Sequence, residues 1–280
     1  MKKISVAFDG LKFCEESMNY GIELASRSKA LLTGIFLDDF LYHTYNVFEN
    51  SGGEGIDGNE LKRLKAEDEN TRIKSISIFY SACRKAKINY AIHRDKSFAI
   101  NELLRETIYS DLLVIGLNET LSHLQEVPPT PFVRNLLAGM QCPVLVVPRE
   151  SKLPEKIFLL YDGKPSSVFA IKMFSYLLPE VKDIPTEVIS VADAEASAEL
   201  PNDTLIREFV NCYYPQASYT VLSGTAKTAI PSYLKKASAA DMVVLGAYNR
   251  TAVSRWFKPS MADILMEKFG FPLFIAHNKS

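Results

Sequence analysis

Short runs of apolar residues alternate along the chain with longer segments of helical spacing. Residues 4–8 form the first apolar run, and segment 15–27 then repeats apolar residues every three or four positions, as one face of a helix does. The pattern predicts further strands and helices up to residue 147, with strands at 31–37, 88–92, 112–115 and 143–147 and helices at 59–86, 100–109 and 131–139. Continuous apolar strands separated by helices are typical of a parallel sheet covered on both faces.

The second half of the chain repeats this order. An apolar run at 157–160 leads into Asp162-Gly163, just as the first run leads into Asp9-Gly10. The Asp-Leu-Leu-Val-Ile-Gly run that ends at Gly116 matches the Asp-Met-Val-Val-Leu-Gly run that ends at Gly246. Further strands are expected at 188–191, 218–222 and 272–276, and helices from Ser166 or Ser167 to 177, at 205–212 and at 229–239. An internal duplication explains this order better than chance does.

The length agrees with two domains. The chain has 280 residues, about twice the common size of one domain, and 47% of them are hydrophobic, which is enough for two substantial cores. The polar, proline-containing segment 148–154 separates the repeats, so we expect domains at 1–150 and 151–280.

Charge and cysteine usage narrow the possible partners and the compartment. Lys and Arg total 32 against 33 for Asp and Glu, so neither nucleic acid nor an anionic membrane is expected as a partner. No stretch reaches the ~20 apolar residues that a membrane span needs. The four cysteines are far apart and the four histidines have no metal-ligand spacing, which indicates reduced thiols in the cytoplasm and no metal site.

The order, spacing and repetition of these motifs resemble the tandem universal stress proteins, the UspA-like family. Each unit has a strand into Asp-Gly, an Asp-led apolar strand ending in Gly before a long loop, and a final strand such as 143–147. The resemblance implies two doubly wound α/β units, each a five-stranded parallel sheet of order 3-2-1-4-5 with helices on both faces. It also implies that the two final strands pair within the chain, and it leaves further oligomers open.

The resemblance further implies a non-catalytic regulatory or protective role in the stress response, through adenine nucleotide or unknown protein partners. In the family, ATP or AMP with Mg²⁺ is held by an acid after strand one, by backbone near the end of strand two, and by a Gly-x2-Gly-x9-Gly-Ser/Thr loop after strand four. Glycine lets backbone approach phosphate, and a helix that opens at Ser or Thr favours an anion. The positions of the second half that match are Asp162, Val191, Gly246, Asn249, Arg250 and Ser260.

The loop of the second half keeps more of this motif than the loop of the first half. Asn249 replaces the second glycine, which is tolerable because Asn visits left-handed conformations more readily than most residues. Arg250, Arg255 and Lys258 make the loop basic, whereas Pro259 removes one amide donor before Ser260.

The first half has a degenerate counterpart of the site. Its matching positions are Asp9, Gly116, Glu119 and Thr130, and here only the opening glycine of the loop is kept. Glu119 stands where the second glycine belongs, and a carboxylate there would repel phosphate. Phe36, at the end of the second strand, is large enough to fill the adenine space.

Several alternatives stay open at this point. Asp162 and Asp9 also suit ordinary turn chemistry after a strand. Trp256-Phe257 is either a contact for a partner or packs on its own domain, and the long helix 59–86 has a solvated face or acts as a lid. One rival function is a slow Mg²⁺-dependent adenine-nucleotide hydrolase that uses Gly246, Asn249 and Ser260 to cradle phosphate. Another is an interaction scaffold in which both sites are closed.

Overall fold

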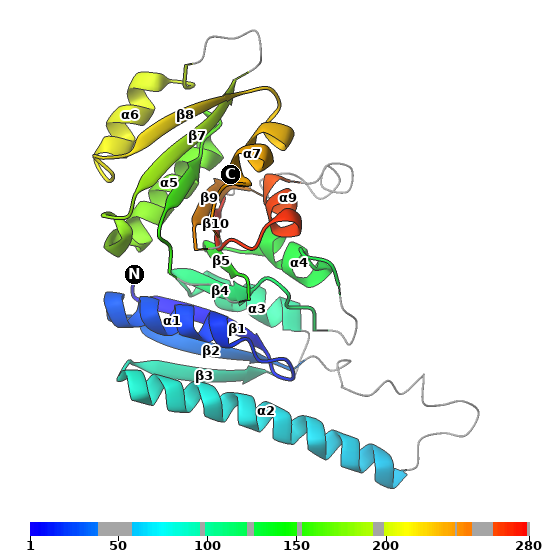
Figure 1. The fold of residues 1–280 in the computed structure, drawn as a ribbon. Coiled ribbons are helices and arrows are strands. Elements are labelled where there is room, and N and C mark those ends of the chain that lie inside the picture. The colour runs from blue at the N-terminus through cyan, green and yellow to red at the C-terminus, as the bar shows by residue number, and fades with distance from the viewer. Residues whose placement is uncertain are drawn as a thin grey trace, which may run out of the picture.

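One sheet of ten strands runs through the whole molecule (Figure 1). The computed structural model describes residues 1–38, 58–95, 99–121, 126–149, 153–192, 199–238, 240–247 and 260–278. The strands are β1 (Lys3–Asp9), β2 (Leu31–Leu37), β3 (Tyr90–Asp95), β4 (Leu112–Gly116), β5 (Val144–Val147), β6 (Ile157–Leu160), β7 (Thr186–Ala192), β8 (Ser218–Ser223), β9 (Met242–Gly246) and β10 (Leu273–Ala276). Their order is β3-β2-β1-β4-β5-β10-β9-β6-β7-β8, so each half has the expected order 3-2-1-4-5.

Helices cover both faces of this sheet, because the strands are apolar on both sides. The helices on one face are α1 (Glu15–Ser28), α2 (Gly58–Ala86), α5 (Pro165–Leu177) and α6 (Asp203–Asn211), with the short 3-10 helix η1 (Pro179–Val181) after α5. Those on the other face are α3 (Ala99–Ile108), α4 (Pro131–Gly139), α7 (Ala226–Leu234) and α9 (Met261–Lys268). Each face therefore has its own hydrophobic core, and both cores continue from one half into the other.

The two halves meet through their last strands. β5 and β10 pair antiparallel, with Leu145 opposite Phe274, whereas strand pairs inside each half are parallel. Leu145 and Phe274 are fully buried, and Phe174 packs edge-on against Phe274 at 5.1 Å between ring centroids. The intrachain pairing that the resemblance implied is thus present.

Some boundaries differ from the predicted ones. Neither Ser166 nor Ser167 caps α5, because the helix already begins at Pro165, whose fixed φ suits the first helical position, and Lys164 is the N-cap residue. The hydroxyl of Ser167 instead donates to the carbonyl of Lys164. Helix α7 ends at Leu234 and not at 239, since the carboxylate of Asp241 accepts from the amide of Ser238 and holds a turn there.

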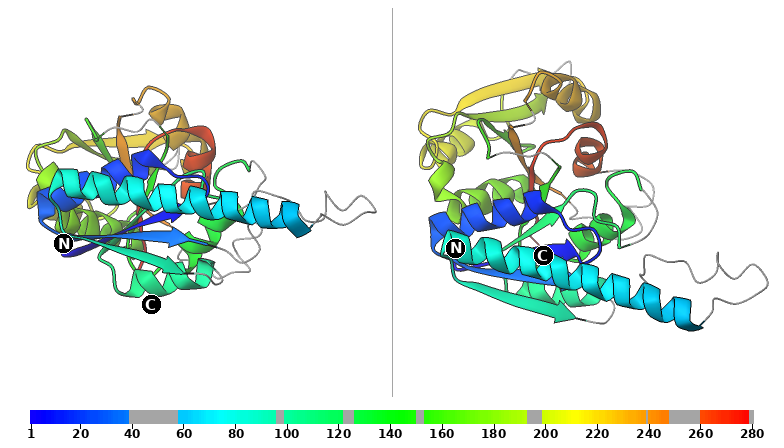
Figure 2. Two further views of the ribbon diagram at one scale, coloured as in Figure 1. Left: turned by 90° about the horizontal axis from the view of Figure 1, so that it is seen from below. Right: turned by 60° about the horizontal axis from the view of Figure 1, so that its bottom comes forward.

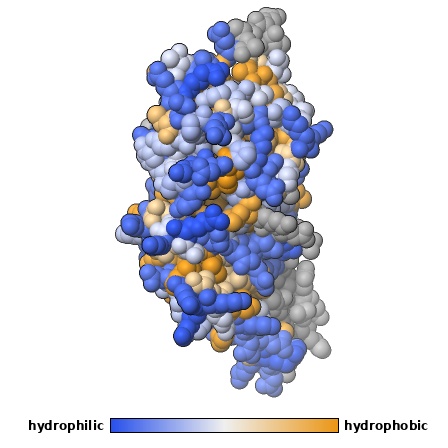
Figure 3. Space-filling model, turned by 60° about the vertical axis from the view of Figure 1, so that its left-hand side comes forward, coloured by the Kyte–Doolittle hydropathy of each residue, from blue (hydrophilic) through white to orange (hydrophobic). Residues whose placement is uncertain are grey.

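The long helix α2 extends beyond the ends of the strands that it covers (Figure 2). Its exposed first turns carry Arg63, which pairs with Glu60 and Glu67. The face of the molecule in Figure 3 is mostly hydrophilic, with small hydrophobic patches between the charged side chains. Among the described helices, none has the length and apolar character needed to cross a membrane.

Candidate functional site

The carboxyl end of β1 places Asp9 at the middle of the edge where a ligand is expected in an open α/β sheet. Asp9 is fully buried, and its Oδ1 accepts hydrogen bonds from the amides of Leu11 (2.8 Å) and Lys12 (3.2 Å). The carboxylate therefore holds the turn into α1. This geometry is the turn chemistry that the sequence also allowed for Asp9.

An aromatic cluster occupies the space beside Asp9. Phe36 is buried at the end of β2, with its ring centroid 5.1 Å from that of Phe8 and 6.4 Å from that of Phe13. Phe13 also stacks on Phe8 at 4.8 Å, and Phe79 of α2 closes the cluster from the other side. The rings fill the region next to the ends of β1 and β2. That this region corresponds to the adenine space of the family stays a prediction.

The side chain of Glu119 turns inward, toward Gly116. Glu119 is only 6% exposed, and its Oε1 would lie 3.1 Å from a Cβ at Gly116. Burial, followed by the negative charge of Asp9, raises the pKa of Glu119 well above its ordinary value. A carboxyl side chain thus stands at position 119, where the loop motif of the family has its second glycine.

Thr130 holds the loop between β4 and α4 through two hydrogen bonds. Its hydroxyl donates to the carbonyl of Glu119 and accepts from the amide of Val133 at 3.2 Å, which caps α4. The prolines Pro128 and Pro129 precede it and leave fewer amide donors in this loop. Thr130 therefore serves the protein's own backbone.

A cleft remains open in front of Glu119. It has a volume of ≈ 410 Å³ and lies between the turn after β1, the end of β4 and the segment after β5. Lys12, Arg149 and Glu119 line it, together with the half-buried Phe13 and Cys14. Because β1 and β4 are the strands at which the chain order reverses, this is the topological switch point of the first half.

In the second half the matching acid is exposed. Asp162 follows β6, accepts a hydrogen bond from the amide of Lys164 (3.1 Å), and lies 3.4 Å from the Nζ of the same residue. Pro201 packs on the neighbouring Gly163, which has φ of +76°, and its carbonyl accepts from the hydroxyl of Tyr161 at 2.7 Å. Val191 is half-buried near the end of β7.

Gly246 is required by packing. A Cβ at this position would lie 2.4 Å from the carbonyl oxygen of Ser166, at the start of α5. The close approach of α5 thus requires glycine here, and the phosphate role that the resemblance implied for Gly246 stays a prediction.

Ser260 begins α9 with a capping box. Its Oγ accepts from the amide of Asp263 (3.1 Å), and the carboxylate of Asp263 accepts from the amide of Ser260 (2.7 Å). Arg134 of α4 lies 3.5 Å from Asp263, so a cation of the first half stands at the first turn of a helix of the second half.

Comparisons with known proteins agree with this architecture. No family model and no curated protein sequence matches the chain. Among solved structures, a universal stress protein from Archaeoglobus fulgidus DSM 4304 covers 99% of this chain and 98% of its own, with 12% identity and a TM-score of 0.70. A functionally unknown protein from Pseudomonas aeruginosa PAO1 covers 100% of this chain and 93% of its own, with 14% identity and a TM-score of 0.59. The chain has the fold of a tandem universal stress protein.

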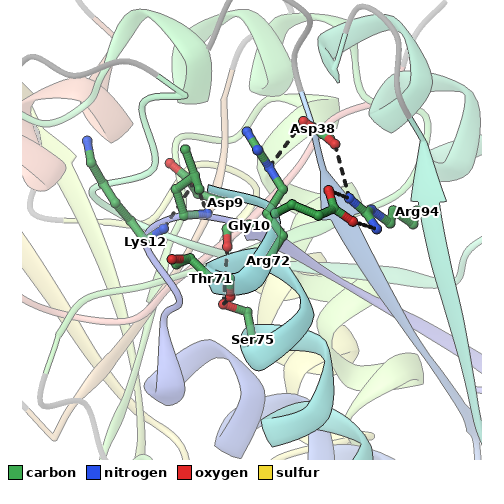
Figure 4. A network of polar contacts seen from close by, with 10 residues as sticks. Asp9, Gly10, Lys12, Asp38, Thr71, Arg72, Ser75 and Arg94 are labelled. Carbon is green, nitrogen blue, oxygen red and sulfur yellow. Dashed lines mark hydrogen bonds and ion pairs between the residues drawn. The ribbon is translucent and has the colours of Figure 1, made fainter. Parts of the chain in front are cut away.

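In this universal stress protein fold, the first half contains an ion-pair network that the sequence did not indicate (Figure 4). Arg72, which is 5% exposed, lies over Gly10 and places its Nε 3.1 Å from Asp38. Arg94 of β3 binds both oxygens of Glu69 at 2.8 and 2.5 Å and lies 3.5 Å from the other oxygen of Asp38. Helix α2, for which the sequence left open a solvated face or a lid, thus packs over the ends of β1 and β2 through Arg72.

Other predicted positions lie outside the described residues. These are Asn249 and Arg250 of the nucleotide loop, together with Tyr248, Arg255, Trp256, Phe257, Lys258 and Pro259. Across the described part of the chain, no group of three or more His, Cys, Asp or Glu residues is arranged to hold a metal ion.

Proposed function

We propose that this chain is a non-catalytic regulatory or protective protein of the stress response that binds adenine nucleotide in its second half. The observation that carries the proposal is the difference between the halves. In the first half Glu119 fills the glycine position and Phe36 fills the adenine region, whereas in the second half Ser260 stands at the start of α9 with a basic loop before it.

The start of α9 supports an anion in physical terms. Capping uses the Ser260 oxygen as an acceptor, and a hydroxyl also has one proton to donate, which a phosphate oxygen can accept. Amides at a helix N-terminus favour negative charge, and Arg134 offsets the charge of Asp263 in the first turn. Asn249 and Arg250 would complete the cradle, with Mg²⁺ on the phosphates, and Asp162 and Val191 would flank the base.

The direct test is ligand identification followed by calorimetry. Purified protein is denatured, released small molecules are identified by mass spectrometry, and ATP and AMP are then titrated with and without Mg²⁺. The proposal predicts micromolar binding that Ser260→Ala weakens. Thr130→Ala is the matched control, because it removes the equivalent helix cap in the first half and leaves nucleotide affinity unchanged.

The other functions are distinct outcomes of the same experiment. Magnesium-dependent phosphate release that persists through repurification and disappears in Ser260→Ala plus Arg250→Ala identifies a slow hydrolase. Absence of released ligand and of heat at millimolar nucleotide contradicts nucleotide binding and leaves the scaffold. Cytoplasmic location, protein partners and further oligomers stay predictions from the sequence.

A further inference from the structure

The cleft of the first half has a charge arrangement that a nucleotide does not match. At ≈ 410 Å³ it is large enough for a small organic molecule, and Glu119 is its buried acid. Asp9, fully buried, is close enough for its charge to raise the pKa of Glu119. A phosphate placed here would lie beside Glu119 and near the negative charge of Asp9, which disfavours an anion.

Cations stand on the same cleft but at exposed positions. Lys12 and Arg149 are both exposed, and the positive charge of each lowers the pKa of Glu119 against the larger effect of burial. The cleft thus has a buried acid and two exposed cations. This order of charges suits a ligand with a positive group inside and a negative group outside.

Three further ionisable side chains line the cleft beside Glu119, and they are Cys14, Glu15 and Glu16. Burial raises the pKa of the Cys14 thiol to about 11, so it stays neutral near pH 7. Glu15 and Glu16 in the first turn of α1 also line the cleft and add negative charge. The ring of Phe13 forms an apolar wall, and an aromatic face attracts an organic cation.

We propose that the cleft of the first half binds a small zwitterion, with its ammonium group against Glu119 and its carboxylate between Lys12 and Arg149. The ligand class is that of ω-amino acids, in which a short carbon chain separates the two charges. This site is independent of the nucleotide site proposed for the second half.

Binding of an ammonium group at Glu119 moves a proton. Below its raised pKa the carboxyl group is protonated, and a cation beside it favours the carboxylate. The O–H proton is then released to the buffer as the ammonium-carboxylate pair forms. Titrations in two buffers of different ionisation enthalpy, at a pH where the group is protonated, measure this release.

The experiment uses the full chain and calorimetric titration of unbranched ω-amino acids with two to six carbons. For the member that binds best, we expect a Kd of about 1 mM or tighter. The amine and the carboxylic acid of the same chain length, which each lack one charge, should bind at least ~10-fold more weakly. The proposal is wrong if no member binds at millimolar concentration, or if an analogue with one charge binds equally well.

Variants locate the two ends of the ligand. Glu119→Gln should lower affinity by roughly tenfold or more and abolish proton release, whereas Glu23→Gln, on the outer face of α1, should change neither. The double variant Lys12→Ala plus Arg149→Ala removes two exposed side chains, so it should keep the fold. It should also weaken binding, because it removes both cations that contact the carboxylate of the ligand. Unchanged affinity in both the Glu119 and the double variant would overturn the proposal.

Discussion

Arg134 on α4 and Asp263 on α9 form an ion pair of 3.5 Å across the junction of the two halves. The two partners differ in exposure, because the Arg134 side chain is 54% exposed whereas that of Asp263 is 11% exposed. Asp263 also completes the capping box of Ser260. The carboxylate therefore has a structural role in α9 that does not depend on the arginine.

This asymmetry predicts unequal effects on the free energy of unfolding. Asp263→Ala should cost about 1 kcal/mol or more through loss of the capping box. Arg134→Ala should cost only ~0.2–1 kcal/mol, since exposed pairs contribute little. Urea denaturation of both single variants and the double variant measures these costs, and an equal loss in the two single variants would contradict the prediction.

The ion pairs around Arg72 should matter more than those elsewhere on the same helix. Arg72→Met removes one of the two ion-pair partners of Asp38 and leaves Arg94 as the other. The loss of this charged contact should cost about 1.5–3 kcal/mol. Arg63→Met removes two exposed pairs of α2 and should leave the stability almost unchanged. Guanidinium denaturation compares the stability of the two variants. Similar midpoints would show that the ion pairs of Arg72 stabilise the protein no more than the exposed pairs of Arg63 do.

The stabilising contribution of Glu187 should be lost in acid. Burial acts to raise its pKa, but hydrogen bonds from Lys156, Thr220 and Tyr233 outweigh burial and lower it. Since the folded pKa is the lower one, this stabilisation is present above the unfolded value of about 4.3 and is lost as pH falls through the folded pKa.

The corresponding measurement is unfolding of Glu187→Gln and wild type from neutral pH to pH 3. The stability difference should shrink as pH falls. Tyr233→Phe should cost about 1 kcal/mol at neutral pH through loss of one hydrogen bond, whereas Tyr109→Phe, at an exposed position, should cost nothing. A constant difference across the pH range would refute the assignment.

Glu119 should have the opposite pH dependence. Its folded pKa is raised, so its contribution is fully present below about pH 4.3 and is lost as pH rises through the folded pKa. Glu119→Gln should therefore gain stability relative to wild type over that range. Thermal unfolding at a series of pH values checks this, and a gain that does not vary with pH would exclude the raised pKa.

Sequence patterns predicted the architecture because the strands are apolar throughout and their order repeats. The strand order within each half and the pairing of β5 with β10 came from the resemblance, and both are found. That Phe36 takes the place of adenine stays a prediction from its size.

The site was less predictable, because its contacts join residues that are far apart in sequence. No sequence pattern singled out Arg72, which lies on Gly10 and pairs with Asp38. The motif placed Glu119 at the second glycine position, and only the fold shows that its side chain turns back to Gly116. Gly246 was assigned to phosphate, whereas the close approach of Ser166 comes from the packing of α5.

The antiparallel pairing of β5 and β10 has a consequence for how the sequences of the two halves can differ. When two identical subunits build such a sheet, every substitution appears in both of them. In this chain the two halves have separate sequences. A glutamate at position 119 therefore alters the cleft of the first half and leaves the region of Ser260 in the second half as it was. The covalent link therefore allows one sheet to carry two different sites.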